Sequence, residues 1–155
     1  MATKAVTGRG TIFSIQTAAG TPPTVVPVLN MKTYAFSGQS VKFDDVTNLN
    51  SSADGGIIVD ESIPATEDPG TFTASGIWIP SDPGQEAIAA AWESHALTVF
   101  TVQAPIAGAQ TTTGNLYTFS GYLQDNPLPD LDYSKAVTIK FTIKLNTAVA
   151  TTVGS

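Results

Sequence analysis

A stretch near the end of the chain alternates between apolar and polar side chains without a single exception. Residues 137–145 place an apolar residue at every odd position, and the positions between them hold Thr138, Lys140, Thr142 and Lys144. A period of two predicts a β-strand with one buried face and one face in water. Shorter stretches with the same tendency occur at residues 11–16, 24–31, 32–36, 41–44, 71–79, 97–103 and 116–123. The sequence therefore predicts a mainly β fold whose strands are separated by Gly and Pro turns.

One helix is expected against this β background. Asp82 stands where an N-cap would lie, Pro83 takes the first helical position, and Gln85 follows three residues after the cap. The next residues hold four alanines and an Ile88/Trp92 pair at i,i+4 spacing, which predicts that these two side chains pack on the sheet. The acidic residues of this region are expected to face water or a neighbouring molecule: Asp82, Glu86 and Glu93.

Charge is scarce in this chain and sorted along it. Charged residues make up 13% of the sequence, against about 25% in a typical globular domain. All 13 acids lie between Asp44 and Asp132, and all seven Lys and Arg residues lie outside that span. The net charge of −6 argues against a protein that wraps nucleic acid or binds an anionic membrane, since both need clustered Lys and Arg.

Length and composition predict one domain that is made in the cytosol. At 155 residues, the chain is expected to fold as a single unit, 1–155. It contains no cysteine and no apolar run of about 20 residues. Its first residues lack the apolar core of a signal peptide. We therefore expect no disulfide, no membrane anchoring and no export signal.

Three segments fit neither a strand nor a helix pattern. Residues 1–10 are expected to form an N-terminal arm. Residues 46–67 are rich in Asn, Ser, Asp and Gly, and a loop of this length is usually functional or mobile. Residues 146–155 are uncharged Thr, Ala and Val for the most part, and we expect them to extend away from the domain.

Residues that could carry catalysis are few and scattered. The single histidine, His95, falls at the end of the predicted helix, where the helix dipole favours a cation. Asp44 and Asp45 are adjacent and would point to opposite faces of a strand, so they form a poor acid–base pair. Asp130 and Asp132 lack the glycine and the distal glutamate of a calcium loop, and we expect them in a solvated turn. The sequence therefore predicts neither enzymatic activity nor a metal or cofactor site.

Four stretches between residues 8 and 145 are informative through their order. They are the first strand at 8–15, the strand and turn at 41–51, the strand, Pro/Asp turn and helix at 76–94, and the strand at 119–123 with the closing strand at 137–145. This order resembles the tail tube (major tail) proteins of long-tailed, lambda-like bacteriophages. The chain departs from the lambda-type pattern in having Asn50 where Asp is usual, and in showing no C-terminal immunoglobulin-like domain.

The resemblance implies a fold and a function. The fold would be the β-sandwich or half-barrel with one flanking α-helix that phage tail tubes share with type VI secretion tubes. Six copies would close into a ring whose sheets line a lumen, and stacked rings would form a conduit through which DNA passes without specific binding. The segments that reach adjacent rings would be the 1–10 arm, the 46–67 loop and the 146–155 extension. Partners would be the tape measure, tail terminator and distal tail proteins, and the chain would reside in the virion tail after assembly in the host cytoplasm.

The sorted charges suggest how subunits could meet. Basic ends that contact acidic middles of neighbouring copies would set polarity and register, and some of the 13 acids would line the lumen and repel phosphates. Candidate contact residues are Lys4, Arg9, Asp44, Asp45, Asp54, Asp60, Glu61, Glu67, Lys140 and Lys144. Three other readings stay open: a type VI secretion-like tube subunit, a β-sandwich decoration or adhesin module, and a hydrolase built on paired carboxylates.

Overall fold

The alternating strand predicted at residues 137–145 lies inside an antiparallel sheet. The computed structural model describes residues 8–47, 53–54, 57–58 and 60–155. In it, β12 (Thr138–Leu145) pairs with β10 on one side and β8 on the other, along a path that runs β2-β1-β9-β10-β12-β8-β3. The other strands of this path are β1 (Ile12–Ala18), β2 (Thr24–Pro27), β3 (Met31–Ser37), β8 (Thr71–Ile77), β9 (Thr98–Gln103) and β10 (Leu116–Leu123). A short strand, β11 (Pro129–Asp130), pairs with β12.

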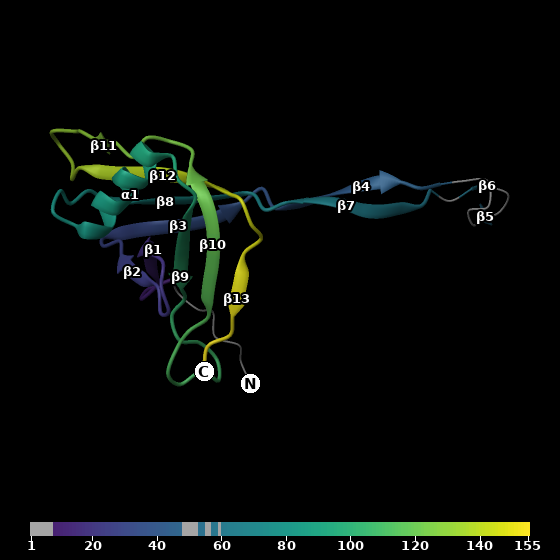
Figure 1. Cartoon of the computed structure of the whole chain (residues 1–155), viewed down its shortest axis with the longest axis horizontal. Helices are drawn as coiled ribbons and strands as arrows, with labels where there is room; N and C mark the ends of the chain where they lie inside the picture. The colour runs from purple at the N-terminus through teal and green to yellow at the C-terminus, as the bar shows by residue number, and fades with distance from the viewer. Residues whose placement is uncertain (1–7, 48–52, 55–56, 59) are drawn as a thin grey trace.

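The sheet bends sharply between β10 and β12, so that it forms two layers. These strands pair over three residues only, from Gly121↔Leu145 to Leu123↔Ile143, and Figure 1 shows β10 running across the direction of β8 and β12. Strands β9, β1 and β2 continue the first layer, and β8 and β3 continue the second. The sheet path ends at β2 and β3, which do not pair with each other. This confirms the predicted mainly β half-barrel with one flanking helix.

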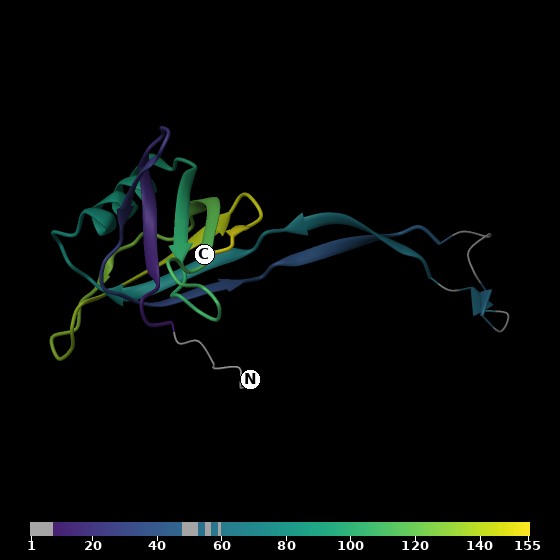
Figure 2. The same cartoon turned by 90° about the horizontal axis from the view of Figure 1, so that it is seen from below.

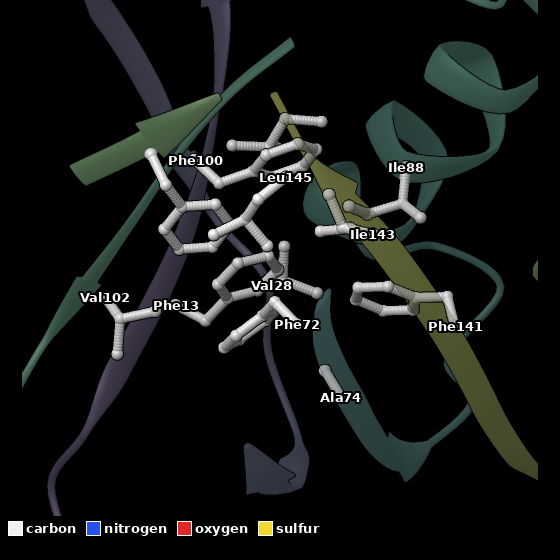
Figure 3. Close-up of a cluster of buried hydrophobic side chains, with 12 residues drawn as sticks. Phe13, Val28, Phe72, Ala74, Ile88, Phe100, Val102, Phe141, Ile143 and Leu145 are labelled. Carbon is white, nitrogen blue, oxygen red and sulfur yellow. The ribbon is translucent and has the colours of Figure 1, made fainter. Parts of the chain in front are cut away.

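Phenylalanines from five strands fill the space between the two layers. Their side chains are each at most 2% exposed: Phe13, Phe72, Phe100, Phe119 and Phe141. The ring centroids of neighbouring pairs lie 5.0 to 5.9 Å apart, and Figure 3 shows most of these rings gathered with Ile88 and Ile143. Burial of one such side chain contributes roughly 1.5–3 kcal/mol relative to exposure. The apolar residues of the alternating pattern are therefore the ones that face this aromatic core.

Helix α1 (Pro83–Ser94) begins and ends where the sequence predicts. The Asp82 side chain caps its first turn by accepting from the backbone N–H of Gln85, and Pro83 opens the helix. His95 ends it in the left-handed region, with φ 50°. Ile88 is fully buried in the core, as predicted, whereas Trp92 is only half-buried and rests edge-on against the His95 ring at 5.4 Å.

The prediction that Asp82 faces water is wrong, because this side chain is 3% exposed. Its Oδ2 atom accepts two backbone N–H groups, from Gln85 at 3.0 Å and from Leu29 at 3.2 Å. Gln85 is buried beside it, donates to the carbonyls of Ile77 and Leu29, and accepts from the backbone N–H of Ile79. The cap therefore also ties the helix to the β2–β3 connection and to the end of β8.

The prediction of a loop over residues 46–67 is corrected by the structure. Strand β4 (Ser40–Asp45) pairs antiparallel with β7 (Ser62–Asp68), and β5 (Ala53–Asp54) pairs with β6 (Ile57–Ile58). Strands β4 and β7 thus form a long hairpin that projects from the body of the molecule (Figures 1 and 2). Every residue of β4 is exposed, and β7 is exposed up to Glu67.

The prediction that residues 146–155 extend away from the domain is also wrong. Strand β13 (Ala150–Thr152) pairs with the first half of β10. The carbonyl of Ser155 accepts three backbone N–H groups, from Thr111, Thr112 and Thr113, at 2.9, 2.8 and 3.1 Å. Backbone hydrogen bonds, which leave no hydrophobic pattern, thus hold the C-terminal segment against the body.

Candidate assembly surfaces

The β4–β7 hairpin contributes nothing to the hydrophobic core of its own chain. Among the described residues, no member of the core cluster lies between Phe36 and Phe72. The hairpin instead exposes large apolar side chains: Val41 is 45% exposed, Phe43 61%, Val46 39% and Ile63 52%. A two-stranded hairpin without a covered face is marginally stable in water, and exposed apolar clusters of this kind mark contact surfaces. The hairpin therefore presents an apolar surface that the described part of its own chain leaves uncovered.

Two glycines mark the place where the hairpin leaves the body. Gly38 separates β3 from β4 with φ 75°, and Gly70 separates β7 from β8 with φ 82°. A Cβ atom on Gly70 would overlap the carbonyl oxygen of Ser37, because the segments at residues 37–39 and at Gly70 lie very close together. The hairpin root thus requires glycine for both its backbone conformation and its close approach.

An ion pair holds the hairpin root to the sheet. The Lys144 ammonium on β12 lies 2.9 Å from Asp68 Oδ1, and the same oxygen accepts the backbone N–H of Gly70. These bonds, the one from Lys144 first, lower the pKa of the Asp68 carboxyl from its ordinary value. Lys144 is one of the candidates for contact between subunits, and within its own chain it forms this ion pair.

The acidic candidates of the hairpin lie on both of its faces. Cross-strand partners share a face, so Asp45 and Ser62 lie on the face of Phe43 and Pro64, while Asp44 lies with Ile63 on the other. Asp45 accepts the backbone N–H of Thr47, and the hydrogen bonds from Thr47 lower the pKa of its carboxyl.

The remaining candidates are spread more widely. Asp60 is exposed, and Glu61 is half-buried with its backbone N–H donated to Thr47 Oγ1 at 2.7 Å. Glu67 is exposed on β7, Asp54 lies in β5, and Lys140 is exposed on β12. Lys4 lies outside the described residues. Arg9 is exposed at the rim of a groove described below.

A groove of about 1070 Å³ lies at the open side of the half-barrel, where β3 faces the β10–β13 layer. Aromatic side chains form part of its wall: Tyr34, Phe36 and Tyr117 are each half-buried, and Val102 lies beneath them. Burial raises the pKa of the Tyr34 phenol. Its charged lining residues are Arg9 and Lys32, and no Asp or Glu is among the described residues that line it. The groove therefore combines an apolar wall with a cationic rim.

Hydroxyl groups cover most of the outward face of β8 and β12, which is called the hydroxyl-covered face of the sheet below. On β8 and β12, the exposed or half-buried positions between core residues are Thr71, Thr73, Ser75, Thr138, Lys140, Thr142 and Lys144. The Thr33 and Ser75 hydroxyls, and those of Ser37 and Thr71, bond to each other across β3 and β8. The seven strands of the main path contain no Asp or Glu. Carboxylates therefore lie on the hairpin, the helix, the short strand β11 and the loops.

One exposed apolar loop follows β10 and was missed at the sequence level. Leu128 is 67% exposed, Leu131 74% and Tyr133 fully exposed. Asp132 nearby accepts from the backbone N–H and hydroxyl of Ser134, and these bonds lower the pKa of its carboxyl. A solvated turn was expected for Asp130 and Asp132, and the three large apolar side chains beside them were the available signal of an exposed apolar surface.

Two absences are found among the described residues. No group of three or more His, Cys, Asp or Glu side chains there is placed to hold a metal ion. Within the same ranges, no helix is long and apolar enough to cross a membrane.

Comparison of the sequence with protein families and with curated proteins finds no match to any family model and none to any curated protein. Comparison of the structure finds strong likeness. A chain in the tail of an empty GTA (gene transfer agent) particle of C6 symmetry superposes with a TM-score of 0.69 at 14% identity, covering 96% of this chain and 100% of the other. The SPP1 tail tube gives a TM-score of 0.64 at 12% identity over 97% of this chain and 80% of that one.

A third likeness comes from an injection machine. A chain in the PVC sheath–tube complex of an extracellular contractile injection system gives a TM-score of 0.66 at 10% identity, covering 96% of this chain and 92% of that one. Helix, half-barrel and hairpin are all within these aligned lengths, since nearly the whole chain is covered. The chain therefore has the fold that the SPP1 tail tube and the GTA tail are built from.

Proposed function

We propose that this chain is the repeating subunit of a phage-type tail tube, a structural protein and not an enzyme. The observation that carries the proposal is a projecting hairpin with exposed apolar side chains on a body that shares the tail-tube fold. The hairpin costs stability in an isolated subunit, because its apolar surface is left in water. In a tube, a neighbouring subunit covers that surface.

The free edges of the sheet support assembly into rings. Strands β2 and β3 end the sheet path, and each offers unpaired backbone groups along one edge. Contacts of one edge with a different edge of the next copy are heterologous, and such contacts close into a ring or continue as a filament. The C6 symmetry of the GTA tail supports six copies per ring. The hairpin then joins successive rings.

The hydroxyl-covered face of the sheet is our candidate for the wall of the lumen. A duplex can slide past Thr and Ser side chains, because neutral hydroxyls do not hold phosphates as clustered Lys and Arg would. Since the main strands carry no carboxylate, any acids at the lumen come from the hairpin or the loops. DNA transit without specific binding fits this surface. By resemblance, a tape measure, a terminator and a distal tail protein would meet the tube, in the tail of the virion.

A second candidate function is supported by the likeness to the PVC sheath–tube complex. An inner tube of a contractile injection system would use the same ring and the same hairpin. It would differ in its outer surface, which a sheath must contact, and in its cargo, which need not be DNA. The two functions therefore share one assembly and diverge in what surrounds and passes through it.

The experiment that tests the shared proposal is electron microscopy of purified protein beside a hairpin deletion. In the deletion, residues 41–67 are replaced by a two-residue Asn-Gly turn, which leaves every core residue in place. We expect the native chain to form rings or tubes. We expect the deletion variant to keep its circular dichroism spectrum and remain as globules.

Two outcomes would contradict the proposal. Native protein that stays monomeric by light scattering across a wide range of concentration and salt would exclude self-assembly. Tubes formed equally well by the deletion variant would show that the hairpin has no part in assembly. A purified sheath protein that coats the tubes would favour the injection-system alternative over the tail of a long-tailed phage.

A further inference from the structure

The loop that follows β11 carries an aromatic side chain that the described part of its own chain leaves uncovered. Tyr133 is fully exposed, and Leu131, two residues before it, is 74% exposed. Tyrosine is enriched at protein interfaces, because its ring buries a large area while its hydroxyl can still form a hydrogen bond. Residues 131–135, called the Tyr133 loop below, therefore present an anchor without a pocket of their own.

Hydrogen bonds within the Tyr133 loop fix the shape of its turn. The Asp132 carboxylate accepts the backbone N–H of Ser134 at 2.9 Å and the Ser134 hydroxyl at 2.8 Å. The Lys135 ammonium lies 3.8 Å from the same carboxylate. A side chain presented by an ordered turn loses less conformational freedom on binding. The loop is thus a preorganised projection, and Figures 1 and 2 show it at the end of the body remote from β13.

The groove offers a pocket that fits this anchor. Its wall holds the half-buried rings of Tyr34, Phe36 and Tyr117, with the Phe36 and Tyr117 centroids 6.5 Å apart. An aromatic side chain that enters beside them gains both area burial and ring contacts. The groove, of about 1070 Å³, leaves room for Leu131 next to the tyrosine ring.

The two surfaces also carry opposite charge. Residues 124–134 hold three acids and no Lys or Arg. The groove has Arg9 and Lys32 at its rim, and among the described residues its lining contains no acid. Asp130 and Lys32 of one chain border the same small hollow, but they form no ion pair within the part of the chain that the structure describes. Opposite charges at matching surfaces guide association and fix register.

A chain does not bring its own loop into its own groove. Tyr133 is fully exposed, so its own groove does not hold it. The loop lies remote from β13, whose Thr151 lines the groove. The loop of one copy can therefore fill the groove of another, and each copy then still offers one loop and one groove.

We propose that the groove receives the Tyr133 loop of a second copy of this chain, with Tyr133 seated on the aromatic wall and the acids of residues 124–134 facing Arg9 and Lys32. This rests on the proposed tube function and specifies a contact between neighbouring copies of one ring. The contact joins different surfaces of the two copies, so it is heterologous, and a heterologous contact of suitable rotation closes into a ring.

Truncation of the anchor tests the proposal first. Tyr133→Ala removes the ring of the side chain, and Tyr133→Phe is the matched control that keeps it. Neither should shift the urea midpoint of the unassembled subunit, because the residue is fully exposed. We expect Tyr133→Ala to raise the protein concentration needed for ring formation by at least about tenfold, as measured by light scattering and electron microscopy, and Tyr133→Phe to leave it nearly unchanged. Equal concentrations for all three proteins would overturn the anchor.

Cross-linking then tests where the loop lies, because the native chain has no cysteine. Lys135→Cys, two residues from the anchor and 77% exposed, is mixed with Thr151→Cys, an exposed residue of the groove. The mixture is assembled and treated with a short bis-maleimide. We expect a link between position 135 of one chain and position 151 of another, identified by mass spectrometry of the joined peptides. Ser94→Cys is the matched control: it is exposed at the end of α1, outside the groove, and should not join to position 135.

The outcomes separate this proposal from the tube function. Rings or tubes that form without the link between positions 135 and 151, or with an equal link to position 94, would overturn the groove as receptor and leave the tube function standing. A link within a single chain between Lys4→Cys and Thr151→Cys would show that the chain's own N-terminal residues occupy the groove instead. Native protein that never assembles would overturn both.

Discussion

Lys144 on β12 donates to Asp68 at the end of β7 over 2.9 Å, and so joins the root of the hairpin to a central strand of the sheet. The two residues are 76 positions apart in the sequence. Gly70, two residues beyond Asp68, donates its backbone N–H to the same carboxylate oxygen. One carboxylate therefore joins the hairpin root both to β12 and to the turn that precedes β8.

The first prediction concerns the titration of this carboxylate. Because hydrogen bonds lower the pKa of Asp68, with the one from Lys144 as the main cause, Lys144→Met should raise that pKa toward its ordinary value. A carboxyl NMR titration of both proteins measures it, with Asp132 as internal control, since Ser134 causes its shift. Because the pKa of Asp68 is lowered in the folded protein, its ion pair with Lys144 contributes fully to stability at pH values above the ordinary Asp pKa. That contribution is lost as the pH falls through the pKa of the folded protein. An Asp68 titration unchanged in the variant would contradict the contact.

The second prediction concerns the cap of α1. Asp82→Ala removes the acceptor of two backbone N–H groups, those of Gln85 and Leu29, in a site that is 3% exposed. Loss of a buried cap should lower the free energy of unfolding by about 1–3 kcal/mol. Asp82→Asn can keep both bonds, because a single oxygen accepts them, and should cost less than Asp82→Ala. Urea denaturation of the three proteins gives the comparison, and equal losses in the two variants would count against the bonding described.

The third prediction concerns Ile88, a helix side chain of the core cluster that is fully buried. Ile88→Ala should lower the free energy of unfolding by about 2–5 kcal/mol, since Ile88 is 0% exposed and truncation leaves a cavity. The same truncation at Ile63, 52% exposed on the hairpin, should change it by no more than about 0.5 kcal/mol. Thermal or urea unfolding of the unassembled protein separates the two. A large loss at Ile63 would mean that the hairpin packs on its own body after all.

The fourth prediction concerns the glycines at the hairpin root. Gly70→Ala forces a Cβ atom onto the Ser37 carbonyl at φ 82°, so both overlap and backbone strain oppose it. Gly108→Ala is the matched control, because its φ is 63° but nothing lies within 4 Å of the added Cβ. The control should lower the free energy of unfolding by about 1 kcal/mol through backbone strain alone, and Gly70→Ala should lower it clearly more, as measured by urea denaturation. Similar losses of unfolding free energy in the two variants would show that the segments at Ser37 and Gly70 are not closely packed.

Most of the sheet could be predicted because its strands bury one face. The period of two at β12 and the Asp-Pro-x-Gln start of α1 are local signals. Both elements are observed at the residues that carry these signals. The hairpin strand β7 gave no such signal, because nearly all of it is exposed and a strand without a buried face has no reason to alternate. The turn signals at Gly38 and Gly70, which bracket the hairpin, were the available clue.

The other errors share a second cause, which is dependence on distant backbone. Asp82 was identified as a cap, but its carboxylate also accepts the N–H of Leu29, 53 residues away. The fold of the C-terminal segment depends on three N–H groups at 111–113 that bind the Ser155 carbonyl. The groove could not be predicted either, because its aromatic wall is formed by residues of β3 and of the β10–β13 layer, which lie far apart in the sequence. No window of sequence contains these relationships.

The last prediction concerns the hydroxyl-covered face of the sheet as the wall of a lumen. Thr142 lies on β12 directly opposite Thr73 of β8, between core residues Phe141 and Ile143. Thr142→Lys should leave tubes intact but slow the passage of DNA, since each added cation gains a phosphate contact, and higher salt should restore the rate. Ser94→Lys places the same charge at the exposed end of α1 and should have no effect. Release of DNA from assembled particles, followed by dye fluorescence at several salt concentrations, measures the rate. Equal release by both lysine variants and the native chain would place this face outside the lumen.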